Sequence, residues 1–205
     1  HFVPRYRPWQ QRIAFVPDGD FFAAMREGKA SVVTDTISEF TEKGVQVSSG
    51  EVIEADVVVT ATGFDLAVFG DIPFTVDGEP VDFTRHVTWR GLMISDIPNM
   101  AYAFGYFRHS WTLRIDLVND LIGRILARMD ERGDRVVVPT LRAQDADMPR
   151  LPWVSEDNFN PGYIGRSQHR MFGQGDREPW THMHEHDVDR VELPKADLDD
   201  GLQYR

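Results

Sequence analysis

The pattern of apolar and polar positions in the first third of the chain predicts strands. Apolar and polar residues alternate over residues 45–49, and residues 31–35 are rich in β-branched side chains, so both stretches are predicted strands. Glycine follows a polar residue at positions 44 and 50, where turns between strands belong. Residues 57–59 are three consecutive valines, which is typical of a strand buried on both faces of a parallel sheet.

The clearest helix is predicted from Trp111 to about residue 132. Apolar side chains recur there at every fourth position, and three further residues widen the stripe: Leu113, Leu117, Leu121 and Ile125, with Val118, Ile122 and Met129. Ser110 is a candidate N-cap, and Gly133 is a candidate terminator in a left-handed conformation. Residues 99–107, just before this helix, are predicted to form a short buried strand.

A shorter helix is predicted near the N-terminus. Asp18 or Asp20 can cap it, and Gly28 can end it. Beyond about residue 140 the chain carries prolines and polar residues without a clear period, so we expect an irregular arm that wraps over other structure.

Composition and charge restrict the classes of function. The chain has 205 residues, of which 41% are hydrophobic and 27% charged, as in an ordinary globular protein. Its formal net charge of −11 argues against binding nucleic acid or anionic lipid surfaces. With no cysteine, disulfides, thiolate nucleophiles and cysteine-based zinc sites are excluded. No apolar run is long enough to span a bilayer, so we expect a cytoplasmic protein. The N-terminus has neither a start methionine nor a signal-peptide pattern, so we also expect a fragment.

The run Ala61-Thr62-Gly63-Phe64 is the strongest candidate for ligand contact. It follows the predicted buried strand, and ligands of open α/β sheets bind at the carboxyl ends of strands. Small residues and a glycine there let the backbone approach a ligand closely. The alternative is an ordinary strand followed by a turn.

The start of the predicted long helix is a second candidate. Free N–H groups at Trp111, Thr112 and Leu113 create a positive end that can stabilise negative charge on a cofactor oxygen. The alternative is an amphipathic helix that packs on a sheet and binds nothing.

Two charged or titratable clusters complete the candidates. Arg12 lies in a proline-bracketed basic loop near Trp9, where its planar guanidinium can hold a phosphate or a developing anion. The alternative is a solvated basic loop. Alternating histidines on a strand can ligate a metal, and Asp187 and Asp189 could be further ligands. The favoured alternative is a polar segment near the C-terminus that binds nothing, so no metal site is predicted. These histidines are His182, His184 and His186.

Six segments, in this order, resemble class B flavoprotein monooxygenases of the Baeyer–Villiger type, and within them the actinobacterial EthA-like enzymes. They are PRYRPWQQR, VPDGDFFAAMREGKASVVTDTISEFTEKG, ADVVVTATGFD, PNMAYAFGYFRHSWTLRIDLV and, more loosely, PGYIGRS and QGDREPW. The resemblance implies an α/β fold that is the C-terminal remainder of a flavoprotein with two dinucleotide-binding domains. Residues 1–60 would end the NADPH domain, residues 61–140 would belong to the FAD domain, and residues 141–205 would form the irregular arm.

The resemblance also implies roles for particular residues. Arg12 matches the family arginine that stabilises the anionic flavin peroxide and contacts the nicotinamide. Gln11 replaces a lysine that contacts the NADP 2′-phosphate, which leaves the choice between NADPH and NADH open. The residues of the ATGF run would mark the return to the FAD domain, and the helix start at Trp111 would face the flavin.

The glycine-rich motifs that bind the phosphates of FAD and NADPH in the family are missing from the sequence. Residues 173–178 begin like such a motif, but Glu178 stands where its third glycine belongs. We therefore expect the chain alone to bind FAD weakly and to be inactive.

The resemblance implies a substrate that is a small apolar ketone, sulfide or thioamide. Aromatic residues of the arm are candidates for lining its pocket, with simple packing as the alternative: Trp153, Phe159, Tyr163 and Trp180. A separate N-terminal half or a second copy of the chain is the expected protein partner. Two further readings stay open: a non-enzymatic remnant that binds a partner, and another two-domain flavoprotein such as a reductase or an N-hydroxylating monooxygenase.

Overall fold

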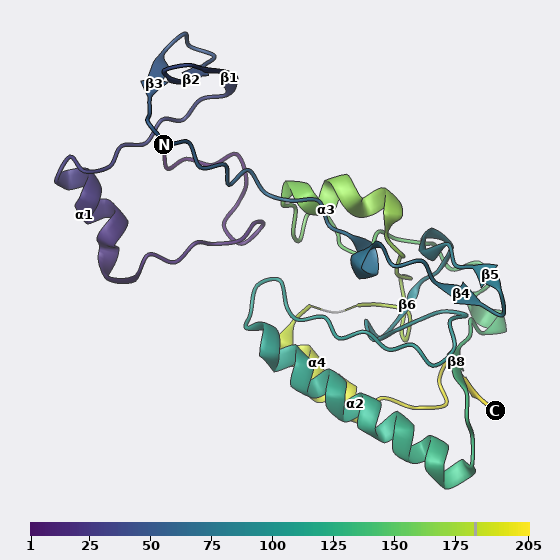
Figure 1. Cartoon of the computed structure of the whole chain (residues 1–205). Coiled ribbons are helices and arrows are strands. Elements are labelled where there is room, and N and C mark those ends of the chain that lie inside the picture. The colour runs from purple at the N-terminus through teal and green to yellow at the C-terminus, as the bar shows by residue number, and fades with distance from the viewer. Residues whose placement is uncertain (183) are drawn as a thin grey trace. The chain divides into compact units, whose positions relative to one another are not determined.

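The computed structural model describes residues 1–182 and 184–205 and divides the chain into two compact units (Figure 1). The first unit comprises residues 1–8 and 13–64. The second comprises residues 9–12 and 65–205, so a short piece of the N-terminal loop belongs to it. Helices and strands are mixed in both units, and the fold class is α/β in this broad sense.

The first unit contains one helical segment and one small sheet. The helical segment consists of the 3₁₀ turn η1 (Pro17–Gly19) and helix α1 (Asp20–Arg26). The sheet is antiparallel in the order β1-β2-β3, with strands β1 (Ile37–Thr41), β2 (Gly44–Val47) and β3 (Val52–Glu54). Gly19 in a left-handed conformation precedes α1, so the expected cap by Asp18 or Asp20 is wrong, whereas Gly28 is left-handed after the helix as predicted.

Two predicted strands of the first unit are absent from the described structure. Residues 31–35 form no strand, and the strands lie further along the chain instead. Residues 57–59 also form no strand, and their side chains are 77%, 44% and 83% exposed. A strand needs a hydrogen-bonding neighbour, and every ladder among the described residues is antiparallel and lies elsewhere in the chain. The prediction of a buried parallel strand at 57–59 is therefore wrong for this chain.

The second unit is built from short ladders, 3₁₀ turns and three α-helices. Its strands form three antiparallel pairs: β4 (Thr75–Val76) with β5 (Glu79–Pro80), β6 (Thr88–Trp89) with β7 (Met93–Ile94), and β8 (Val137–Pro139) with β9 (Leu202–Tyr204). Its helices are α2 (Trp111–Arg132), α3 (Gly162–Ser167) and α4 (His186–Glu192). Its 3₁₀ turns are η2 (Val68–Asp71), η3 (Phe83–Arg85), η4 (Ala143–Asp145), η5 (Gln168–Arg170) and η6 (Leu193–Lys195).

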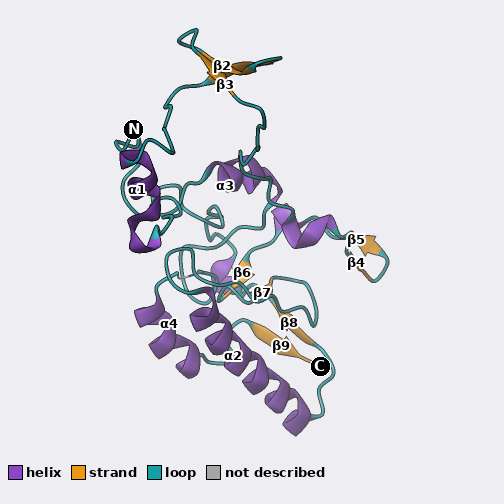
Figure 2. Cartoon of the chain, turned by 60° about the vertical axis from the view of Figure 1, so that its left-hand side comes forward, coloured by secondary structure: helices purple, strands orange, loops and turns teal. Residues whose placement is uncertain are grey.

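Helix α2 is the longest element, and it forms where the sequence predicts it. Figure 2 shows α4 beside it, in agreement with the contacts between the two helices. Gly133 ends α2 in a left-handed conformation with φ 74°, as predicted. The buried face includes Leu121 and Ile125 of the predicted stripe and Val118 and Met129, which were predicted to widen it, whereas Leu113 is exposed and Arg114 is added.

Residues 99–107 do not form the predicted strand. An isolated bridge joins Met93 to Ala101, and the rest of the segment is in no ladder. The segment is nevertheless buried from Gly105 to Phe107. Its burial comes from side-chain packing, so the apolar pattern predicted an interior segment correctly but not its hydrogen bonding.

Two apolar clusters form the interior of the second unit. One lies between α2 and the C-terminal part of the arm and includes Trp89, Leu121 and Trp180. The other includes Ile94, Phe107, Trp153 and Phe172. Arm residues contribute to both, as Trp153 and Trp180 are 2% and 0% exposed. No helix in the described part of the chain is long and apolar enough to cross a membrane.

Leu121→Ala should lower the free energy of unfolding by about 2–5 kcal/mol, because it opens a cavity under α2. Leu121 is 1% exposed, whereas Leu126 on the same helix is 55% exposed. Leu126→Ala is the matched control and should change stability by less than about 0.5 kcal/mol. Urea unfolding of both variants measures the difference, and equal losses would contradict the assigned buried face.

Candidate functional site

The arm holds the piece of the N-terminal loop that belongs to the second unit. The backbone N–H of Asn160 donates to the carbonyl of Gln10 at 2.7 Å. The Gln11 amide donates to the Asn160 carbonyl and to its side-chain oxygen, at 3.4 and 3.5 Å. The Gln10 amide reaches the carbonyl of Asp157 at 3.2 Å. These contacts attach the loop from both backbone and side chain.

Arg12 lies next to this attachment. Its guanidinium carbon is 5.9 Å from the centre of the Phe159 ring, within range of a cation–π interaction. The residue is exposed, and it takes part in no ion pair among residues 1–182 and 184–205. A positive charge placed over an aromatic face and not neutralised by a carboxylate is suited to meeting an anion.

A chain of ring contacts leads from Arg12 to the start of α2. Phe159 stacks on Phe107 at 4.4 Å between ring centres, and Phe107 meets Trp153 at 5.7 Å. Trp153 meets Phe104 at 4.8 Å, and Phe104 meets Trp111 at 4.6 Å. We call these five residues the aromatic cluster: Phe104, Phe107, Trp111, Trp153 and Phe159. The arginine and the helix start thus lie on one cluster.

The start of α2 is a helix end without a side-chain cap. Ser110 occupies the N-cap position, but its hydroxyl pairs with the Thr112 hydroxyl at 3.1 Å and makes no cap hydrogen bond. Trp111, Thr112 and Leu113 are exposed. A β-carbon at Gly105 would lie 2.3 Å from the Trp111 indole, so only glycine lets the indole pack on this backbone. The positive helix end is therefore open to a partner with negative charge.

A buried ion pair holds this end of α2 in place. Arg114 is 0% exposed, and its Nε donates to the Asp189 carboxylate of α4 at 3.2 Å. Its other nitrogens donate to carbonyls of Arg90, Gly91 and Phe104 at 3.1, 3.4 and 3.1 Å. The Tyr106 hydroxyl donates to the same carboxylate at 2.8 Å.

His182 and His184 are buried in contact with Phe107 and Trp153 of the aromatic cluster. Their ring centres are 3.8 Å apart, and His184 also lies 4.3 Å from Phe107. None of their four ring nitrogens has a hydrogen-bond partner in the described structure. Burial lowers the pKa of His184 to about 3 and the pKa of His182 well below its ordinary value, and the charge of Arg114 adds to both effects. The pair is neutral at pH 7.

The histidines do not assemble the metal-ligand set that the sequence left as a minor alternative. His186 begins α4 and lies against Tyr106, while Asp189 is held by Arg114. Across residues 1–182 and 184–205, no three side chains of histidine, aspartate or glutamate come together in a way that would hold a metal ion.

Comparison with known proteins gives relatives that cover almost the whole chain, although no protein-family model matches it. FAD-containing monooxygenase EthA of Mycobacterium tuberculosis is 43% identical over 207 residues, which is 100% of this chain. Probable FAD-binding monooxygenase AlmA of an Acinetobacter species is 41% identical over 98% of the chain. The resemblance to EthA-like monooxygenases is confirmed. Putative FAD-containing monooxygenase MymA of Mycobacterium tuberculosis is 38% identical over 98% of the chain.

The chain spans about 40% of the length of these EthA-like relatives.

The residues that the EthA-like resemblance singles out fall into two groups. The first group belongs to the second unit, where Trp111 is part of the aromatic cluster and Arg12 lies over Phe159: Gln11, Arg12, Trp111, Thr112 and Leu113. The run Ala61, Thr62, Gly63 and Phe64 belongs to the first unit, where it lies outside the helix and the strands and is exposed. It does not follow a strand there, so the strand-end geometry expected for it is wrong.

Sequence reasoning missed the residues that hold the site together. Asn160 and the Arg114–Asp189 pair were not among the candidates. A signal for Arg114 was present, because it falls on the helix face of Val118, Leu121 and Ile125, where a charged residue must be buried and paired. Asn160 carries no such signal in its local sequence.

The buried histidines predict that acid destabilises the second unit. Their folded pKa values are lowered, so the stabilisation is complete above the unfolded value of 6.5 and is lost as pH falls below it. The two residues together should remove about 4 kcal/mol of unfolding free energy between about pH 7.5 and about pH 5. Chemical denaturation at each pH measures this slope.

His184→Phe should remove about half of this pH dependence, because phenylalanine suits the aromatic surroundings and carries no titrating group. His169→Phe, at an exposed position, is the control and should leave the slope unchanged. If His184→Phe kept the full slope, the histidine pair would not be its source.

Proposed function

We propose that this chain is part of an FAD- and NADPH-dependent monooxygenase that inserts oxygen into ketones or oxygenates the sulfur of sulfides and thioamides. The observation that carries the proposal is the position of Arg12, unpaired with any described carboxylate and on the same aromatic cluster as the start of α2. The printed names of the relatives, FAD-containing and FAD-binding monooxygenases, support the same class of chemistry.

The residues around the aromatic cluster fit the electron-rich edge of a flavin. The uncapped N–H groups at the start of α2 can donate to carbonyl oxygens of a flavin ring, and the helix end favours negative charge there. When bound, reduced flavin supplies the activation of O₂, and the protein supplies position and electrostatics. Trp111 and Phe104 offer flat apolar surface beside these donors.

Arg12 provides a fixed positive charge in this proposal. A guanidinium carries a planar, delocalised positive charge, so it can stabilise negative charge as that charge develops on the reacting oxygen. The Phe159 ring beneath it and the hydrogen bond from Gln11 to Asn160 limit how far the Arg12 side chain moves. Preorganised charge of this kind requires no rearrangement during the reaction.

Gln11 has a positioning role in the same proposal. Its amide is engaged by Asn160, so it holds the loop that carries Arg12. A neutral amide also lacks the charge with which a lysine would bind a 2′-phosphate. A preference for NADPH over NADH would then depend on groups other than Gln11.

The remaining parts of the proposed flavoprotein would supply what this sequence does not contain. The chain has no glycine-rich turn to hold the phosphates of FAD or NADPH. Residues 57–59 are exposed and apolar, and a neighbouring strand from a separate N-terminal half or a second copy would cover them. On this basis, the chain alone binds FAD weakly and is inactive.

The test is Arg12→Ala in the whole flavoprotein that contains this sequence. Flavin reduction by NADPH should continue, whereas oxygenation of a ketone or sulfide should fall by about 10²–10³-fold, as for loss of one preorganised donor. Stopped-flow absorbance measures the reduction, and product analysis measures the oxygenation.

Arg26→Ala is the control, since Arg26 is an exposed arginine at the end of α1 in the first unit. It should leave both steps unchanged. Arg12→Lys should restore part of the oxygenation, because it keeps the charge but not the planar fork. Full oxygenation by Arg12→Ala would refute the role assigned to Arg12.

A further inference from the structure

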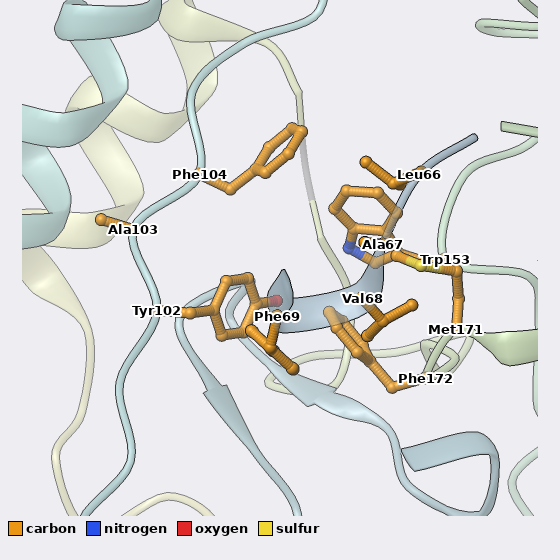
Figure 3. A pocket seen from close by; sticks show the side chains of 10 residues that line it. All are labelled: Leu66, Ala67, Val68, Phe69, Tyr102, Ala103, Phe104, Trp153, Met171 and Phe172. Carbon is orange, nitrogen blue, oxygen red and sulfur yellow. The ribbon is translucent and has the colours of Figure 1, made fainter. Parts of the chain in front are cut away.

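An apolar pocket opens beside the aromatic cluster in the second unit (Figure 3). Its volume is about 190 Å³. The segment before and within η2, the stretch just after Ala101 and three residues of the arm line it: Leu66, Ala67, Val68, Phe69, Tyr102, Ala103, Phe104, Trp153, Met171 and Phe172. No lining residue carries a charge, and half of them are aromatic.

The size of the pocket matches one ring. An apolar cavity of about 150 Å³ in another protein stays dry and binds benzene. The present pocket is somewhat larger, at about 190 Å³, so it has room for a six-membered ring with a small substituent. Its aromatic walls favour flat apolar groups, which can pack edge to face or offset against them.

Phe69 forms one wall in a strained backbone conformation. Its φ and ψ are 48° and 34°, a left-handed conformation that a bulky residue rarely adopts. Its ring stacks on Phe172 at 5.9 Å and an interplanar angle of 12°, and it meets Tyr102 at 5.8 Å. Strain of this kind persists only where packing enforces it, and it gathers at binding sites. The wall is thus shaped in advance of any ligand.

The polar edge of the pocket stays neutral. The Tyr102 hydroxyl shares a 2.6 Å hydrogen bond with the Thr88 hydroxyl. Burial raises the pKa of Tyr102 above its ordinary value, so the phenol keeps its proton. With no ionised group in its lining, the pocket disfavours charged ligands, which would lose hydration without gaining a partner.

The pocket and the candidate site share two walls. Phe104 and Trp153 line the pocket, and both belong to the aromatic cluster that leads to Trp111 and Arg12. A molecule whose ring fills the pocket would therefore have its remaining part beside the cluster.

We infer that this pocket is the subsite that takes the apolar, ring-sized end of a neutral substrate. The assignment to a substrate rests on the proposed monooxygenase function, whereas binding of an apolar ring does not. The pocket predicts that substrates with one ring are preferred over those with a methyl group in its place, because only a ring fills the volume.

The first test uses toluene as an unreactive probe of the whole flavoprotein, with saturation-transfer NMR to measure its binding. Ala67→Leu places three more carbons into the pocket and should weaken toluene binding about tenfold or more, equivalent to about 1.4 kcal/mol. Ala146→Leu, the same change at an exposed position outside the pocket, should alter binding less than about twofold. Ala67→Val, which adds two carbons, serves as a second filling variant if Ala67→Leu does not fold.

The second test compares acetophenone with acetone as substrates. Ala67→Leu should lower kcat/KM for acetophenone about tenfold more than kcat/KM for acetone, because only the ring of acetophenone has to enter the pocket. Absence of saturable toluene binding, or equal binding by wild type and a folded filling variant, would overturn the pocket assignment. Toluene binding without oxygenation of either ketone or of a sulfide would refute the proposed function and leave the pocket standing.

Discussion

The second unit depends on one buried guanidinium. Arg114 has no access to water, so its N–H groups must find acceptors inside the protein, and they take them from residues 90, 91 and 104 and from Asp189. Removing one partner of such a pair costs about 3–5 kcal/mol, because the other charge stays buried. The requirement joins α2, α4, the turn between β6 and β7 and the segment that contains Phe104 at one point. It also places Phe104 next to Trp111, and thereby positions the aromatic cluster.

The long helix and its end were predictable because they depend on local signals. A repeated apolar period and a glycine beyond the last turn predict α2 and its terminator at Gly133. The structure forms no strand at residues 57–59 or 99–107, although the sequence predicts one at each place. A strand requires a hydrogen-bonding partner, and the local sequence does not specify that partner. Burial of Arg114 on α2 depends on acceptors in three other segments, and the sequence around the helix does not identify those acceptors.

The candidate site was likewise predictable only in part. Arg12 and the helix start are visible in sequence, since a loop arginine and a helix N-terminus have recognisable chemistry. Their association is not visible, because it depends on rings from Phe104 to Phe159 that pack across distant segments. The neutral histidine pair is a further example. The alternating histidines left a metal site as a minor alternative, and only their burial beside Phe107 and Arg114 shows why they hold no charge.

The hydrogen bonds between the N-terminal loop and the arm form late when the chain is synthesised. Gln11 and Asn160 are 149 residues apart in sequence, so Arg12 leaves the ribosome long before the segment that holds it exists. Until Phe159 and Asn160 emerge, the loop has neither its ring nor its hydrogen bonds. A chain that ends before the arm would contain Arg12 but would lack Phe159 and Asn160, which hold the loop. The contacts that position Arg12 can therefore form only late in synthesis, when almost the entire second unit has been made.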